Sequence, residues 1–325
     1  NDDRKEKVAQ IVKVFKYNAI VQNLAPIAAD DYKQLRVADS VALQHMNRIL
    51  ELALSKEKTT EALTELFDEL GSEVRDADII RWYGMDANYY YLSEALCGPI
   101  IKTLLEEKIE TEPAEVINRI EDLMLNHSAN SMMTAVMDYA VIVARLYEKA
   151  LTLGSLTLNT ADEYVMRYES DYCFIDQYYR LANETYFGID PTSELFDTVQ
   201  KVKRGLDQNY SKLCNRINLE WTRCLKETGG MDEVHLLRQY NFYDEKIKSI
   251  HKKVVVIVSD ALRYEVAQEL IGELAKTRHI ASLKPAIAML PSETKYSKPS
   301  LLPHRELKLY GKGEEQGMAV DDHIL

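Results

Sequence analysis

Apolar positions recur at helical spacing along the first half of the chain. In four stripes they lie three and four residues apart, which favours helices with one buried face. The stripes are Val8/Ile11/Val12/Phe15, Leu43/Met46/Leu50/Ala53, Leu63/Leu66/Phe67/Leu70 and Val116/Ile117/Ile120/Leu123. Pro113 precedes the last stripe, and proline is favoured at the first position of a helix. We therefore expect residues 1–160 to form an N-terminal helical domain.

Between residues 160 and 190 the pattern becomes strongly aromatic. The residues concerned are Tyr164, Tyr168, Tyr172, Phe174, Tyr178, Tyr179, Tyr186 and Phe187. Aromatic rings can stack on nucleic-acid bases, but few lysines or arginines interleave, so we favour packing between helices. Asp190-Pro191 predicts a further helix start, because a capping residue precedes proline. Residues 233–253 predict one more helix, so residues 161–250 read as a helical lead-in.

From residue 251 the pattern changes again. Val254 to Val258 is a continuous β-branched run, typical of a strand covered on both faces. Residues 261–276 have a helical pattern, and residues 281–290 form a second candidate strand. This order predicts a βαβ unit with parallel strands. The fold class is therefore a mainly α-helical region followed by the start of an α/β domain in residues 251–325. About 70 residues are too few for an ordinary doubly wound sheet, so we expect the domain to be truncated.

Two residues follow the predicted strands. Ligands of an open parallel sheet bind outside the carboxyl ends of its strands. Asp260 follows the first strand, and Thr294, in Pro291-Ser292-Glu293-Thr294, follows the second. A carboxylate suits a divalent cation, and a hydroxyl beside that cation can become a nucleophile. Two plainer explanations stay open: Asp260 can cap the following helix, and Thr294 can be an ordinary loop residue.

The segment VVVIVSDALRYEVAQEL, residues 254–270, resembles the opening signature of the PglZ family. This family is the alkaline-phosphatase-superfamily component of BREX phage-defence systems. A second motif agrees in register, because Pro291, Ser292 and Thr294 are followed by Leu301-Leu302-Pro303-His304. The resemblance is strong from about residue 165 to the last residue.

The resemblance implies roles for particular positions. Asp260 would be a ligand of the catalytic metal, and Thr294 would be the nucleophile or a metal-bound hydroxyl. Arg263 would contact the phosphate, or form an ion pair that fixes the turn before the helix. The cofactor would be a divalent metal, Zn²⁺ in the first place, with Mg²⁺ or Mn²⁺ as alternatives. The site would be incomplete in this chain, since the superfamily takes further Asp and His ligands from later positions.

Five further residues near the motifs carry no assigned catalytic role. Ser292 is a second hydroxyl in the same loop as Thr294, and it ranks below Thr294. His304 is read as a structural residue. The tripeptide Asp321-Asp322-His323 has metal-binding side chains, but it lies where the family has a turn or hairpin.

Composition narrows the classes of function. A net charge of −12 gives no general attraction for nucleic acid. No apolar run approaches the roughly 20 residues of a membrane helix, and no signal-peptide pattern opens the chain. We therefore expect a cytoplasmic protein without a membrane partner.

The resemblance also implies an activity. The full-length protein would be a metal-dependent phosphoesterase acting on phosphomonoesters or phosphodiesters, nucleic acid among them, and this fragment would be inactive. Its partners would be other BREX defence proteins. The alternative is a non-catalytic helical scaffold that docks those proteins.

Overall fold

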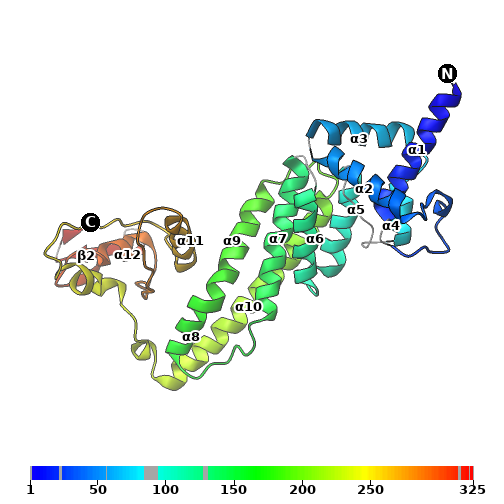
Figure 1. The fold of residues 1–325 in the computed structure, drawn as a ribbon. Coiled ribbons are helices and arrows are strands. Elements are labelled where there is room, and N and C mark those ends of the chain that lie inside the picture. The colour runs from blue at the N-terminus through cyan, green and yellow to red at the C-terminus, as the bar shows by residue number, and fades with distance from the viewer. Residues whose placement is uncertain are drawn as a thin grey trace. The chain divides into compact units, whose positions relative to one another are not determined.

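The computed structural model describes residues 2–21, 24–55, 57–83, 94–126, 131–313, 316–321 and 323–324. The chain is mainly helical, and its strands follow residue 306 (Figure 1). It divides into two compact units, one of Asn1–Glu148 and Tyr178–Asn209, the other of Lys149–Gln177 and Tyr210–Leu325. The expected helical region is confirmed, whereas the domain boundaries at residues 160 and 250 remain predictions.

Amphipathic helices build the first unit, as their apolar stripes predict. They are α1 (Asp2–Val21), η1 (Lys33–Leu35), α2 (Ser40–Leu54), α3 (Glu57–Leu70), α4 (Asp76–Tyr83), α5 (Glu94–Thr103), η3 (Leu104–Lys108), α6 (Pro113–Asn126) and most of α7 (Ser131–Leu151). Helix α6 begins at Pro113, as predicted. The buried stripe residues are Val12, Met46, Leu50, Phe67, Val116, Ile120 and Leu123. Ile11 departs from this pattern, since it is 56% exposed.

A buried carboxylate ties the loop after α1 to two helices of the first unit. Asp30 is only 1% exposed. Its Oδ2 accepts hydrogen bonds from the hydroxyls of Tyr17 and Tyr83, the latter at 2.6 Å, and its Oδ1 accepts one from the Tyr32 N–H at 2.8 Å. Burial and the hydrogen bond to Asp30 raise the pKa of Tyr17. The carboxylate thus holds three donors from α1, the loop and α4.

The aromatic region packs between helices, as predicted. Its elements are α8 (Ala161–Arg167), η4 (Tyr168–Tyr172), α9 (Cys173–Phe187) and α10 (Phe196–Thr228). In the second unit, Tyr168 and Tyr210 donate hydrogen bonds to the two carboxylate oxygens of Asp176 at 2.7 and 2.8 Å. In the first, the rings of Tyr139 and Tyr186 lie 6.1 Å apart. Both contacts join neighbouring helices.

One predicted helix start and one predicted helix are wrong. Helix α10 begins at Phe196 rather than at Asp190, because the Asp190 carboxylate accepts the Thr192 N–H at 2.8 Å and closes a turn. Residues 233–253 form only the short helical turns η5 (Met231–Glu233), η6 (Gln239–Asn241) and η7 (Tyr243–Ile247). Here the backbone of Leu237 and Gln239 bonds to Ile287 at 2.8 and 2.9 Å, so it is not available for a continuous helix.

The predicted parallel βαβ sheet does not form in the described residues. Its helix is present as α11 (Tyr264–Ala275). Val254–Val258, however, is not part of a strand, and its side chains are 41–85% exposed. Residues 281–290 contain a single parallel bridge, between Ile287 and Arg238. A β-branched run becomes a strand only when a neighbour supplies its hydrogen bonds, and here none does.

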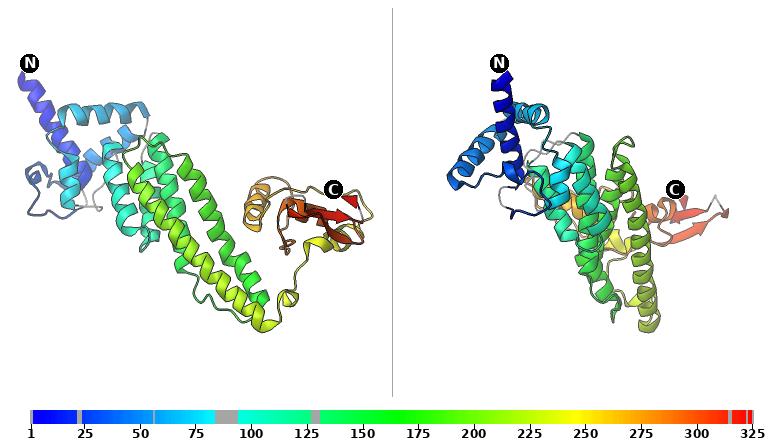
Figure 2. Two further views of the ribbon diagram at one scale, coloured as in Figure 1. Left: turned by 180° about the vertical axis from the view of Figure 1, so that it is seen from behind. Right: turned by 90° about the vertical axis from the view of Figure 1, so that its right-hand side faces the viewer.

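A small antiparallel sheet occupies the last described residues instead. Strands β1 (Leu307–Tyr310), β2 (Gly317–Val320) and β3 (His323–Ile324) pair in that order (Figure 2). Helix α12 (Thr294–Ser300) packs beside β2. The buried Tyr296 of α12 donates a hydrogen bond to Gln316 at 3.4 Å. None of the described helices is long and apolar enough to cross a membrane.

Candidate functional site

Asp260 lies in a tight turn before α11. The next residue, Ala261, has φ = +54°, a left-handed conformation that residues other than glycine rarely adopt. Asp260 Oδ1 accepts the Ala261 N–H at 3.1 Å. Helix α11 begins only at Tyr264, and its N-cap is Arg263, so Asp260 does not cap it. The carboxylate is exposed and free to meet a ligand from solvent.

Thr294 is the first residue of α12, and its hydroxyl meets Asp260. Its Oγ1 lies 3.2 Å from Asp260 Oδ1 and 3.3 Å from Oδ2, within hydrogen-bond distance of both oxygens. The two residues are 34 positions apart in the sequence. The structure therefore brings together the two residues that each follow a predicted strand, although the strands are not formed. Their roles as metal ligand and nucleophile stay predictions.

Arg263 forms an ion pair with a buried acid. Its Nη2 lies 2.6 Å from Glu265 Oε1. The Glu265 side chain is 1% exposed and that of Arg263 is 62% exposed. This is the ion pair that the sequence left open as one of two roles, and it bridges the N-cap and first turn of α11. A phosphate contact by Arg263 remains a prediction.

Two of the other sequence candidates, His304 and Asp321, have structural partners. His304 Nδ1 lies 2.7 Å from the carbonyl oxygen of Leu302. Asp321 Oδ1 accepts the N–H groups of Arg305 and Glu306 at 2.8 and 2.9 Å. These backbone bonds hold the pKa of Asp321 below its usual value. Asp321 thus closes a turn of the sheet, whereas Asp322 lies outside the described residues.

The carboxylate of Asp260 and the hydroxyl of Thr294 could both bind a divalent cation. Carboxylate and hydroxyl oxygens suit Mg²⁺ or Mn²⁺, which keep several waters. A catalytic zinc site usually has three protein ligands. The described part of the chain contains no cluster of three or more His, Cys, Asp or Glu residues that could hold a metal ion. The pair accordingly fits part of a hydrated-cation site.

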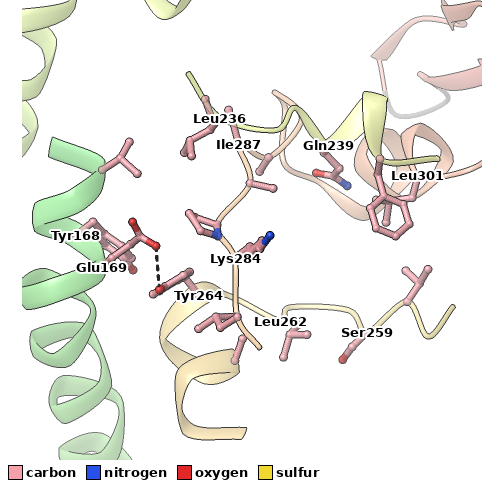
Figure 3. Close-up of a pocket in the computed structure, with 18 of the residues that line it drawn as sticks. Tyr168, Glu169, Leu236, Gln239, Ser259, Leu262, Tyr264, Lys284, Ile287 and Leu301 are labelled. Carbon is pink, nitrogen blue, oxygen red and sulfur yellow. Dashed lines mark hydrogen bonds between the residues drawn. The ribbon is translucent and has the colours of Figure 1, made fainter. Parts of the chain in front are cut away.

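A hollow of about 590 Å³ lies beside the segment that leads to Asp260 (Figure 3). It is lined by Val256–Ser259 on one side, Leu283–Ala288 on another and by Tyr168 and Glu169 of η4. Tyr264 donates a hydrogen bond to Glu169 Oε1 at 3.2 Å, the dashed line in Figure 3. Burial, followed by the nearby Glu169 charge, raises the pKa of Tyr264 to about 12. An apolar surface therefore adjoins Ser259, the sequence neighbour of Asp260.

Sequence reasoning missed the contribution of η4 to this hollow. Tyr168 was expected to pack between helices, and its ring does lie 6.0 Å from that of Tyr264. The sequence pattern assigns no role to Glu169. The available signal was weak, because a charged residue within an aromatic helical pattern ordinarily indicates a solvated face.

Comparison with known proteins supplies an independent result. Residues 242–323 match the family model described as the BREX system PglZ alkaline phosphatase-like domain. Over 146 residues the chain is 32% identical to "Alkaline phosphatase-like protein BrxZ" of Escherichia coli O9:H4 (strain HS), which covers 41% of this chain and 16% of that protein. Over 173 residues it is 28% identical to "Alkaline phosphatase-like protein PglZ" of Bacillus cereus (strain H3081.97), covering 50% of this chain.

The chain spans only a small part of these relatives. The matched stretches make up 16% and 20% of their lengths. No solved structure matches the chain. The matched family segment, residues 242–323, contains Asp260, Arg263 and Thr294.

Proposed function

We propose, for a chain whose residues 242–323 match the model of the PglZ family, that Asp260 and Thr294 form part of the active site of a metal-dependent phosphoesterase. The substrates would be phosphomonoesters or phosphodiesters, nucleic acid included. The protein would act within a BREX-type phage-defence system, with other proteins of that system as its partners.

The observation that carries this proposal is the contact between Thr294 and Asp260. Thr294 Oγ1 lies 3.2 and 3.3 Å from the two carboxylate oxygens. A loop threonine needs no such partner, and α11 does not use Asp260 as its cap. Both side chains are exposed, so a substrate can reach them. The contact supports a paired role for residues that have no other evident reason to meet.

Each residue has a distinct task in the proposed reaction. Thr294 Oγ1 releases its proton to water and attacks the phosphorus, the bond from phosphorus to the ester oxygen breaks, and the alcohol leaves after taking a proton from water. Asp260 accepts the hydrogen bond of the hydroxyl and so orients its oxygen. Lys295, next in sequence, brings a positive charge to the start of α12, and Glu293 lies 3.6 Å from its Nζ. Water then releases the phosphoryl group from Thr294.

A divalent cation is the implied cofactor, and Asp260 and Thr294 would hold it. When bound, it would offset the negative charge that develops on the phosphoryl oxygens. Zn²⁺, Mg²⁺ and Mn²⁺ are the ions to compare.

The test is metal-dependent hydrolysis of bis(p-nitrophenyl) phosphate by the natural polypeptide that contains these residues. Asp260→Asn and Thr294→Ala should each lower the rate at least about 100-fold, while Thr294→Ser should retain part of it. Ser292→Ala, a hydroxyl removed from the same loop, is the matched control and should change little. Unchanged hydrolysis by both Asp260→Asn and Thr294→Ala would refute the catalytic assignment.

The same variants test the scaffold alternative. If Thr294→Ala abolishes turnover while the defence complex still assembles, a purely structural role is excluded. If assembly and defence survive every substitution in the pair, the helical scaffold is the better account.

A further inference from the structure

The second half of α10 carries a row of exposed cations on one face. The positions of the row follow one another at steps of four, three, four and three residues, a spacing that places side chains on one face of a helix. They are Lys212, Arg216, Leu219, Arg223 and Lys226, all exposed. At 1.5 Å per residue the row is about 21 Å long. The whole chain has a net charge of −12, yet this face is positive.

The opposite face of α10 packs inside the second unit. The ring of Trp221 lies 5.4 Å from that of Tyr164, and Cys224 is buried. The apolar side of the helix is therefore covered within the unit, and the basic face meets solvent.

Two glutamates lie beside the row, and both are paired with the same arginine. Glu220 Oε2 lies 2.9 Å from Arg223 Nη2, and Glu227 Oε1 lies 3.1 Å from Arg223 Nη1. Glu220 also accepts a hydrogen bond from the Thr157 hydroxyl at 2.9 Å. None of the other three cations of the row forms an ion pair with a residue that the structure describes. These three cations are available to an anionic partner.

The row fits a linear polyanion better than a membrane surface. A helix that lies on a membrane buries an apolar face beside its cations, but in α10 the apolar face is covered within the unit. Each strand of a nucleic-acid duplex instead presents one negative charge per 3.4 Å or so along the axis, so a row of about 21 Å spans about six phosphates. Asn215, exposed next to Arg216, adds an amide that can donate to a phosphate oxygen.

The same face favours a duplex over a single strand. Proteins that bind single strands stack the bases on aromatic side chains, and none of the five positions of the row is aromatic. The chemistry of the row is thus limited to contacts with the phosphate backbone.

We propose that this face of α10 binds the backbone of duplex DNA, with Lys212, Arg216 and Lys226 each contacting a phosphate. The binding is independent of base sequence, because phosphate contacts do not read the bases. It requires neither phosphoester hydrolysis nor the pair of Asp260 and Thr294, so it can fail while the proposed function stands.

The test follows binding of a fluorescein-labelled DNA duplex to the 325-residue chain by fluorescence anisotropy, with EDTA present to suppress hydrolysis. The parent chain should bind, and its affinity should fall as the salt concentration rises from about 50 to about 200 mM. The triple variant Lys212→Gln/Arg216→Gln/Lys226→Gln should bind at least about tenfold more weakly at about 50 mM salt. It should also lower the slope of log K against log salt by about 2 to 3, because three phosphate contacts are lost.

The matched control removes three other exposed lysines of the same unit. Lys252→Gln/Lys253→Gln/Lys284→Gln changes the net charge by the same amount. It should keep the affinity within about threefold of the parent, because charges outside the contact act only through a screened field. Thermal melting should show that both triple variants fold.

Three results would overturn the proposal. The parent chain does not bind the duplex at low salt, the two triple variants lose equal affinity, or the α10 variant binds the duplex as tightly as the parent does. Tighter binding of this face to poly-glutamate or to phosphatidylserine vesicles than to the duplex would also overturn it, and would assign the face to an acidic protein or a membrane.

Discussion

Asp260 lies in a turn whose backbone is strained at the following residue. Ala261 adopts φ = +54°, where its Cβ crowds the backbone, yet this turn places the Asp260 carboxylate beside Thr294. Strained positions persist where the surrounding structure fixes them, and they are frequent at functional sites.

Substitutions at Ala261 test that strain. Ala261→Gly relieves about 1 kcal/mol of steric cost but gives the unfolded chain about as much extra freedom. We expect its free energy of unfolding to stay within about 0.5 kcal/mol of the parent. Ala261→Val should lose more than about 1 kcal/mol, because a β-branched residue tolerates this conformation poorly. Urea unfolding measures both, and equal losses for the two variants would argue against the strained turn.

The two possible roles of Arg263 can be separated by measuring both the stability and the phosphoester hydrolysis of its variants. In the ion pair with Glu265 it compensates a carboxylate that is 1% exposed. Arg263→Ala should therefore lower the free energy of unfolding by about 1 kcal/mol, while Arg263→Lys should lose less. The loss is modest because the Arg263 side chain is 62% exposed. A variant of parental stability with much slower phosphoester hydrolysis would favour the phosphate contact instead.

The sequence could not decide whether Asp260 is a helix cap or a ligand. The answer depends on where α11 begins, and helix starts are defined by backbone bonds that no single residue reveals. The role of Thr294 could not be decided from its neighbours in sequence either, because the Asp260 carboxylate that it contacts lies 34 positions away. The strand-end positions and the matched pair of family motifs both indicated that the two residues lie together, although the predicted strands are not formed.

At the scale of elements, a single buried acid joins three parts of the first unit. Asp30→Ala would leave the donors of Tyr17, Tyr32 and Tyr83 without their acceptor. Each lost hydrogen bond in a buried network costs on the order of 1 kcal/mol or more. We expect a loss of about 3 kcal/mol in the free energy of unfolding of this unit. The exposed neighbour provides the control: Asp31→Ala should stay within about 0.5 kcal/mol. Similar losses for both variants would contradict this account.

A second element-scale contact is sensitive to pH. His235 Nδ1 lies 2.7 Å from Asp162 Oδ2, and the His235 N–H donates to Asp162 Oδ1 at 2.9 Å, joining the segment after α10 to the start of α8. The Asp162 carboxylate raises the pKa of His235 above 6.5, and the His235 N–H lowers the pKa of Asp162 below 3.8. The histidine contribution is complete below pH 6.5 and is lost as pH rises through the folded-state pKa. The aspartate contribution is lost as pH falls below 3.8.

The contact is therefore strongest between about pH 4 and 6.5. An NMR titration of the His235 ring should give a pKa above the ordinary value, and Asp162→Asn should bring it back. An ordinary pKa that does not respond to Asp162→Asn would show that the contact is absent in solution.

For the whole molecule, helices were easier to predict than strands. The stripes around Met46, Phe67 and Ile120 are buried as predicted, because a helix makes its own hydrogen bonds. Val254–Val258 has strong β-propensity, but a strand needs a neighbour to supply its ladder, and propensity does not say whether one is present. The helix expected in residues 233–253 is absent for a related reason, since its backbone bonds to Ile287 across the unit. Backbone hydrogen bonds between segments far apart in the sequence therefore could not be predicted from the local pattern of residues.

The central claim is that Thr294 is the nucleophile, and a trapping experiment tests it most directly. The natural polypeptide containing these residues is mixed with a phosphoester and a divalent cation, quenched in acid and digested. Mass spectrometry should then find a phosphoryl group on Thr294, and none at this position in Asp260→Asn. A phosphoryl group elsewhere in the chain, or turnover that persists in Thr294→Ala, would contradict the account.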